Sequence, residues 1–153
     1  MESTDMKKHA YLIMAHTQPE LLKKLLKMLD DERNDIYLHI DSKAKDYPLT
    51  EVASVLKKSK CIFTERTDVK WGSYSQIHCE MVLLKEAVKT EHAYYHLLSG
   101  MDLPIKSVDD ICSASYVYVG DILYDRQFSR NDAKALPFEP GLRLYQVFQT
   151  YSY

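Results

Sequence analysis

The stretch "HAYLIMAHTQPELLKKLLKMLDD", residues 9–31, decides the fold class because an apolar run passes within a few residues into a segment with helical spacing. The run Ala10–Ala15 has the composition of a strand that is covered on both faces. We expect a helix from Thr17, since Thr17 and Glu20 have the spacing of a capping box and Pro19 is tolerated in a first helical turn. Its apolar residues form one stripe: Leu21, Leu22, Leu25, Leu26, Met28 and Leu29.

The same alternation of strand and helix continues along the chain. Residues 36–40 and 61–64 predict two more short strands, and residues 49–59 predict a helix between them. A third helix is predicted over about residues 75–89, and "AYYHLLS", residues 93–99, predicts a fourth strand before the turn "GMDLP". Short connections between these elements favour a mostly parallel sheet with helices on both faces, a doubly wound α/β fold. The third helix is expected to bury Ile77, Met81, Leu84 and Val88.

The pattern weakens after residue 107. Ser107 and Asp110 have the spacing of another helix start, and "SYVYVGDILY", residues 115–124, is compatible with one more strand. We expect a single domain over residues 1–153, flexible over residues 1–8, without a clear assignment for residues 124–153, and with a fold that is incomplete at the C-terminus. The apolar residues of the last segment, "LRLYQVFQTYSY", predict a homo-oligomer or low solubility.

Composition excludes several classes of protein. With 46% hydrophobic and 27% charged residues, the chain resembles an ordinary globular domain, and a net charge of -2 gives no general attraction to nucleic acid or anionic membranes. The three cysteines, Cys61, Cys79 and Cys112, have no C-x-x-C spacing, which favours a reducing compartment. The apolar runs are too short to span a membrane and the N-terminus lacks a signal-peptide core, so we expect a cytoplasmic protein.

Candidate ligand positions follow the predicted strands, because loops and helix N-termini meet at the carboxyl edge of a parallel sheet. Four such stretches should share one rim: residues 15–17, 41–43, 65–74 and 99–102. Asp41 could accept hydrogen bonds from a base or a ribose, or it could cap a neighbouring turn. A histidine such as His16 is more often structural than functional.

The stretch around Trp71 permits two interpretations. Trp71 and Gly72 could present an aromatic face to a flat base with close backbone approach, or the indole could pack beneath the third helix. Ser73 and Ser75 are candidate N-caps of that helix. In the turn "SGMDLP", Asp102 could bind sugar hydroxyls or stabilise the turn itself.

Absent motifs also discriminate between classes of enzyme. The sequence has neither G-x-G-x-x-G nor G-x-x-x-x-G-K-[ST], which disfavours a dinucleotide dehydrogenase and a P-loop nucleotide hydrolase. It has no G-x-S-x-G nucleophile elbow. It also lacks Asp-x-Asp, the carboxylate pair that could hold a divalent cation against a diphosphate, so no metal site is expected.

Four segments in order, "AYLIMAH", "DIYLHIDSK", "VKWGSYSQIHCEMVLLKEA" and "YYHLLSGMDLPIKS", resemble the core-2/I-branching β-1,6-N-acetylglucosaminyltransferase family, which includes peptide O-xylosyltransferases. The resemblance runs over about residues 10–107. It implies a GT-A-like (Rossmann-like) fold and metal-independent, inverting transfer from UDP-N-acetylglucosamine or UDP-xylose to a glycan or other hydroxyl acceptor. The chain would then be the N-terminal, nucleotide-sugar-binding part of a glycosyltransferase.

The resemblance also implies roles for individual residues. It places Ala15 and His16 beside the nucleotide, Asp41 at the uridine, and Trp71 with Gly72 against the base, where animal branching enzymes often have tyrosine. The turn "SGMDLP" is similar to the family's "CGMDFP" near the donor sugar and acceptor, and it contains Asp102.

Inverting transfer needs a general base and positive charge at the leaving diphosphate. In the family these groups lie downstream of the matched region. Glu139 is the only glutamate after Glu91, and its setting "PFEPG" does not resemble the family's catalytic motif. We therefore expect a chain that binds the nucleotide but transfers sugar poorly. The alternatives are a noncatalytic nucleotide- or protein-binding module and a fragment with no independent role.

Overall fold

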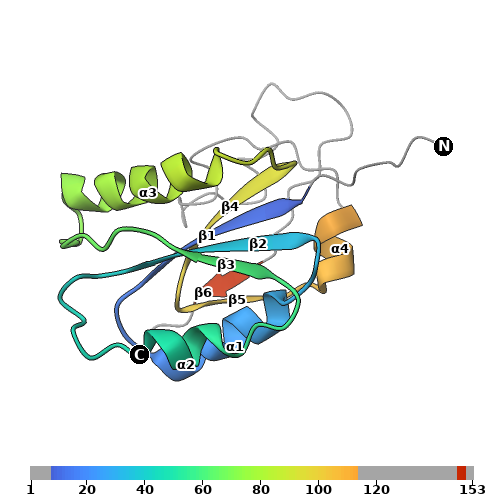
Figure 1. Ribbon diagram of the computed structural model, residues 1–153, viewed down its shortest axis with the longest axis horizontal. Helices are drawn as coiled ribbons and strands as arrows, with labels where there is room; N and C mark the ends of the chain where they lie inside the picture. The colour runs from blue at the N-terminus through green and yellow to red at the C-terminus, as the bar shows by residue number, and fades with distance from the viewer. Residues whose placement is uncertain (1–7, 114–147, 151–153) are drawn as a thin grey trace, which may run out of the picture.

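A parallel four-stranded sheet with the order β3-β2-β1-β4 forms the centre of the described structure (Figure 1). The computed structural model describes residues 8–113 and 148–150. The strands of this sheet are β1 (His9–Ala15), β2 (Asn34–Ile40), β3 (Lys60–Phe63) and β4 (Tyr94–Ser99). The helices are α1 (Pro19–Leu29), α2 (Leu49–Ala53), α3 (Tyr74–Ala87) and α4 (Val108–Ser113), and β5 (Asp102–Pro104) pairs antiparallel with β6 (Phe148–Thr150).

Helices cover both faces of the sheet, which confirms the predicted α/β architecture. Figure 1 shows α1 and α2 below the sheet and α3 above it. On β1, Tyr11 and Ile13 pack in the cluster that includes the leucines of α1, whereas Ala10 and Leu12 pack against α3. Alternate side chains of one strand thus belong to two cores, as the near-continuous apolar run of β1 requires.

The start of α1 differs from the predicted capping box at Thr17. The N-cap is Gln18, in the left-handed region with φ 51°, and no side chain caps the helix. The Gln18 carbonyl accepts hydrogen bonds from the amides of Leu21 and Leu22 at 3.0 and 3.1 Å. Pro19 does occupy the first turn, as expected. The capping prediction was wrong because this backbone turn places Thr17 one residue outside the cap position.

The predicted stripe of α1 is buried except for one residue. Leu21, Leu22, Leu25, Leu26 and Leu29 are buried, whereas Met28 is 47% exposed. Met28 follows Lys27, a basic residue of the last turn, at the border of the stripe. The predicted stripe therefore included one residue too many, Met28, whereas its five leucines were predicted correctly.

The buried face of α3 is not the predicted one. Cys79, Leu83 and Ala87 are fully buried against the sheet. Of the four residues expected to be buried, Ile77, Met81 and Val88 are 55%, 43% and 56% exposed, whereas Leu84 is half-buried and packs against the core beneath the helix. Helical spacing alone could not decide between these two apolar faces. The helix buries the face with the small side chains, cysteine and alanine, which allow its axis to approach the strands closely.

The later elements agree in part with expectation. Ser107 and Asp110 form the predicted reciprocal cap of α4: the Asp110 amide donates to Ser107 Oγ at 3.1 Å, and the Ser107 amide donates to Asp110 Oδ2 at 3.3 Å. The helix α2 is shorter than predicted. Of residues 1–8, which were expected to be flexible, only Lys8 is described, and its Nζ donates to Asp35 Oδ1 at 3.0 Å. The possible strand at residues 115–124 and the apolar end, apart from β6, lie outside the described residues. No helix among the described residues is long and apolar enough to cross a membrane.

Candidate functional site

The strand order creates a switch point between β1 and β4. The chain passes from β1 through β2 to β3 in one direction and then returns to pair β4 with the other side of β1. Ligands of open α/β sheets bind beyond the carboxyl ends of the strands at such a point. Register places these ends together, since Ala15 pairs with Ile40 and Met14 pairs with Ser99. We call the loops that follow these strands the carboxyl rim.

A close backbone approach joins β1 and β4 at the carboxyl rim. The Gly100 amide donates to the Met14 carbonyl at 2.7 Å. A Cβ atom on Gly100 would lie 2.7 Å from the Cβ of Ala15, closer than real Cβ contacts. Glycine is therefore required where the turn after β4 crosses Ala15. Ala15 is buried at this junction, whereas the following His16 is exposed.

Asp102 is the first residue of β5, in a segment that the sequence predicted as a turn, and it holds the turn that precedes it. Its Oδ2 accepts a hydrogen bond from the Ser99 amide at 2.7 Å, and the Met101 amide donates to Ser99 Oγ at 3.2 Å. Asp102 is only 9% exposed. The turn-stabilising interpretation of this carboxylate is thus observed directly, and the turn itself lies beside Ala15.

Asp41 lies at the end of β2 and is 5% exposed. Its amide donates to the Ala15 carbonyl at 2.9 Å, which extends the pairing of β1 and β2 by one step. Its Oδ1 accepts from the Lys43 amide at 2.9 Å, and its Oδ2 lies 3.6 Å from Lys43 Nζ. The carboxylate therefore caps its own turn, as the alternative interpretation proposed, and it also has a cation beside it.

The loop after β2 is joined to the segment that leads to Trp71. The Ser42 amide donates a hydrogen bond to the Thr67 carbonyl at 3.0 Å. Lys43 Nζ donates to the Val69 carbonyl at 2.5 Å and pairs with Asp68 at 2.9 Å. The hydrogen bond with Asp68 raises the pKa of Lys43, and the same bond lowers the pKa of Asp68. These contacts hold the two loops side by side at the carboxyl rim.

Arg66 strengthens this junction and was not singled out by the sequence. Its Nε donates to the Ile40 carbonyl at 3.1 Å, and its guanidinium also donates to the carbonyls of Asp41 and Ala44 at 2.8 and 2.5 Å. The carbonyls of the last residue of β2 and of two residues in the loop that follows it thus converge on one side chain. No spacing rule identifies such a residue, because its partners are backbone atoms of a loop far away in sequence.

A buried histidine makes a second contact between the same two segments. His39 Nε2 accepts a hydrogen bond from the Thr67 amide at 3.0 Å and lies 2.9 Å from Thr67 Oγ1. A ring nitrogen that accepts from an amide carries no proton, so His39 is neutral in this contact. Burial lowers the pKa of His39, which favours the same form.

Trp71 does not pack beneath α3. Its side chain is 90% exposed, and that of Tyr74 is 76% exposed. The loop that carries Trp71 is nevertheless well supported: Gly72 takes φ 68°, Ser73 Oγ accepts from the Ser75 amide at 3.3 Å, and Ser75 Oγ accepts from the Lys70 amide at 2.7 Å. Ser73 is the N-cap of α3, as predicted. The structure therefore presents an open indole on a loop with internal hydrogen bonds.

The predicted site residues fall into two groups. Ala15, Asp41 and the turn that Asp102 stabilises are connected by direct contacts or hydrogen bonds at the ends of β1, β2 and β4. Trp71 and Gly72 follow shortly after Val69, which Lys43 connects to the same rim. His16 extends from this rim as an exposed residue.

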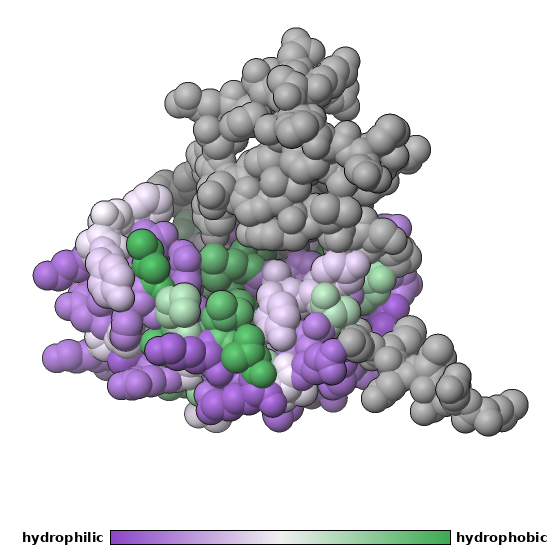
Figure 2. All heavy atoms as spheres, turned by 90° about the horizontal axis from the view of Figure 1, so that it is seen from above, coloured by the Kyte–Doolittle hydropathy of each residue, from purple (hydrophilic) through white to green (hydrophobic). Residues whose placement is uncertain are grey.

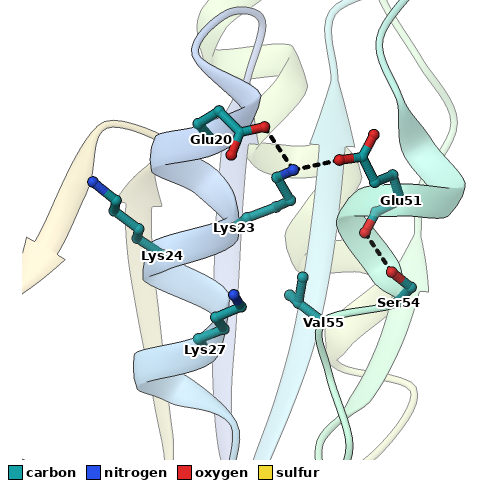
Figure 3. A pocket seen from close by; sticks show the side chains of 7 residues that line it. All are labelled: Glu20, Lys23, Lys24, Lys27, Glu51, Ser54 and Val55. Atoms are coloured by element: carbon teal, nitrogen blue, oxygen red, sulfur yellow. Dashed lines mark hydrogen bonds and ion pairs between the residues drawn. The ribbon is translucent and has the colours of Figure 1, made fainter.

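Other polar clusters do not coincide with the rim. Among the described residues, no three His, Cys, Asp or Glu side chains gather as a metal would require. Figure 3 shows a hollow between α1 and α2, in which Lys23 contacts both Glu20 and Glu51. The carboxylates offset the charge of this lysine, and none of the predicted site residues lines the hollow.

Comparison with known proteins shows the family to which the chain is similar. The model of the Core-2/I-Branching enzyme family matches residues 9–131. A human β-1,3-galactosyl-O-glycosyl-glycoprotein β-1,6-N-acetylglucosaminyltransferase is 27% identical over 116 residues, 73% of this chain and 27% of the relative. A protein of the same name from Bos taurus is 22% identical over 116 residues, with the same shares covered. The chain thus spans about a quarter of the length of these curated relatives.

Proposed function

The chain belongs to the Core-2/I-branching enzyme family, and on that premise we propose that its carboxyl rim binds a UDP-sugar, UDP-N-acetylglucosamine or UDP-xylose, as the donor for inverting transfer to a glycan or other hydroxyl acceptor. The names of the relatives support the sugar and the class of acceptor, since they are β-1,6-N-acetylglucosaminyltransferases that act on O-glycosyl-glycoproteins. The proposed fold of the complete domain is GT-A-like.

One observation supports this proposal most strongly: the junction between the loop after β2 and the segment before α3. Lys43, Arg66 and Ser42 join these loops by hydrogen bonds. One loop carries a buried carboxylate, Asp41, and the other carries an exposed indole, Trp71, two residues after Val69. A nucleoside needs both kinds of group, because its base has apolar faces and its edge and ribose have polar hydrogens.

Within the proposed complex each group has a role that its chemistry permits. The indole of Trp71 stacks on the uracil, and Gly72 allows the backbone to approach it. The carboxylate of Asp41 accepts hydrogen bonds from the base edge or the ribose. Ala15 and His16 line the nucleotide, and the turn of Asp102 lies toward the donor sugar and the acceptor.

Calorimetric titration of the chain with UDP tests this proposal. Replacement of one stacked aromatic residue costs about 1–3 kcal/mol per base, so Trp71→Ala should weaken UDP binding by about tenfold or more. The matched control is Met28→Ala, which removes an exposed apolar side chain from the far end of α1 and should leave the affinity unchanged. Equal UDP affinity for Trp71→Ala and the unaltered chain would show that the indole does not contact the nucleotide.

We propose that binding requires no divalent metal, because the sequence has no Asp-x-Asp pair to hold one against a diphosphate. The same UDP titration in the presence of EDTA and then of Mn²⁺ should give equal affinities. A marked gain with Mn²⁺ that EDTA reverses would contradict metal independence without affecting the proposed role of Trp71.

We further propose that residues 1–153 by themselves bind the donor without robust transfer, because no glutamate in a setting like that of the family's general base was identified. A radiolabelled UDP-sugar assay with glycan acceptors should give little turnover. Rapid transfer would contradict the proposal that these residues bind the donor but lack the groups for catalysis. UDP binding without transfer is also what a noncatalytic binding module would show, and a longer chain that regains transfer would distinguish the two.

A further inference from the structure

The exposed face of α3 carries a regular apolar stripe that the proposed nucleotide site does not use. Tyr74, Ile77, Met81 and Val88, the C-cap residue, are 76%, 55%, 43% and 56% exposed, and Leu84 between them is half-buried, because it also packs against the core beneath the helix. We call these residues the α3 stripe. Figure 2 looks onto this side of the molecule and shows apolar side chains gathered among polar ones in the described part of the face.

The spacing of the α3 stripe is that of a helix–helix seam. Its members follow one another at intervals of three, four, three and four residues along the helix, which is the a and d pattern of a coiled coil. The opposite face of the same helix already packs on the sheet through Cys79, Leu83 and Ala87. The stripe is therefore a second apolar face, available to a helix outside the described core.

Opposite charges on the two edges of the stripe favour a second copy of this chain as the partner. Glu80 lies on one edge, between the stripe and the buried face, and Lys85 lies on the other edge, five positions later. In a parallel pair of identical helices, residues with this relation face each other across the seam, so Glu80 of each copy would meet Lys85 of the other. An antiparallel pair would instead bring Glu80 near Glu80 and Lys85 near His78.

From this stripe and its charged edges we propose that two copies of this chain associate through their α3 helices in parallel, with the two Glu80–Lys85 contacts beside the seam. This dimer differs from the one expected at the C-terminal segment, which lies outside the described residues. A helix of 14 residues is about 21 Å long, and its five-residue stripe is smaller than the roughly 800 Å² per partner of a stable interface. The association is accordingly weak and depends on protein concentration.

Sedimentation equilibrium of the whole chain tests the proposal. The apparent mass should rise from 17.8 kDa toward twice that value between about 10 and 500 µM, the range in which a small interface associates. Ile77→Ser combined with Met81→Ser should weaken the association more than about a hundredfold, because four apolar side chains leave the seam. The control Met28→Ser, also at an exposed apolar position, should behave like the unaltered chain.

Charge exchange tests the parallel arrangement separately. Glu80→Lys or Lys85→Glu alone should weaken the dimer about threefold to tenfold, as two unfavourable contacts replace two favourable ones. The double exchange should restore the original dissociation constant. A chain that remains at 17.8 kDa throughout, an association that survives the two serine substitutions, or a double exchange that fails to restore it would each overturn the proposal. Circular dichroism of each variant verifies that the domain remains folded.

Discussion

The two faces of the central sheet are covered by helices of very different design. On one face α1 buries five leucines on a single stripe and leaves its other residues polar or exposed. On the other face α3 buries only Cys79, Leu83 and Ala87, and carries a second apolar stripe toward the outside. Amphipathic spacing therefore predicts the buried face of a helix only where the helix has a single apolar face.

The largest expected effect lies on the α1 face. Leu25 is fully buried in the core formed by α1, β1 and β2, so Leu25→Ala should lower the free energy of unfolding by about 3 kcal/mol through lost burial and a residual cavity. Met28→Ala in the same helix should change it by less than about 0.5 kcal/mol. Urea unfolding measures both. Similar losses for the two variants would show that α1 is packed differently.

The next effect concerns two histidines on the sheet face that α1 covers, His9 at the start of β1 and His96 in β4. His9 Nδ1 and His96 Nε2 lie 3.0 Å apart, and the His96 ring stacks on Tyr11. Burial, and then the neighbouring His9, lowers the pKa of His96 to about 3, and burial lowers the pKa of His9 as well. Both rings are therefore neutral in the folded protein at neutral pH.

The sign of the resulting pH dependence follows from proton binding. Below the ordinary histidine pKa of 6.5 the unfolded chain binds protons that the folded chain does not. Stability present above that pH should be lost as the pH falls, by up to about 2 kcal/mol for each histidine between pH 6.5 and about 5, since the slope is at most about 1.4 kcal/mol per pH unit. His96→Gln should flatten this dependence, and His16→Gln at an exposed position should not. Parallel pH profiles for all three proteins would contradict the assignment.

A smaller effect is expected on the buried face of α3. Burial raises the pKa of the Cys79 thiol to about 12, and the side chain is fully enclosed. Cys79→Ser should cost about 1–2 kcal/mol of unfolding free energy, because the hydroxyl loses its hydration. Cys61→Ser, at a less buried position, should cost less. An equal cost at both positions would mean that α3 lies less closely on the sheet than described.

The smallest effect should come from the α3 stripe. Ile77→Ala at low protein concentration should change the free energy of unfolding by less than about 0.5 kcal/mol, since the side chain is 55% exposed. The matched comparison is Leu83→Ala on the opposite face of the same helix, which should cost about 2 kcal/mol or more. A large loss of unfolding free energy for Ile77→Ala in the monomer would mean that Ile77 is buried in the core, as the sequence pattern predicted.

Much of the site's location followed from the sequence, because the ends of parallel strands must share an edge. The pattern placed residues 15–16, 41 and 99–102 there, and the structure connects Ala15 with Asp41 and with the turn after β4 at this edge. Arg66 and His39 were missed. Both act by binding backbone atoms of a loop more than 20 residues away, and no local pattern records such a partner.

Local sequence patterns predicted the alternation of strands and helices from β1 to β4, the strand at Ala10–Ala15 that is buried except for Met14, the leucine stripe of α1 and the cap of α4, but neither β5 nor β6. These features depend on residues a few positions apart, whose propensities and spacing are visible in the chain. Three features were visible only in the folded chain: Gln18 is the N-cap of α1, α3 buries Cys79 rather than Ile77, and Trp71 is exposed. These outcomes depend on how closely segments remote in sequence can pack, and that is settled by contact across the sheet.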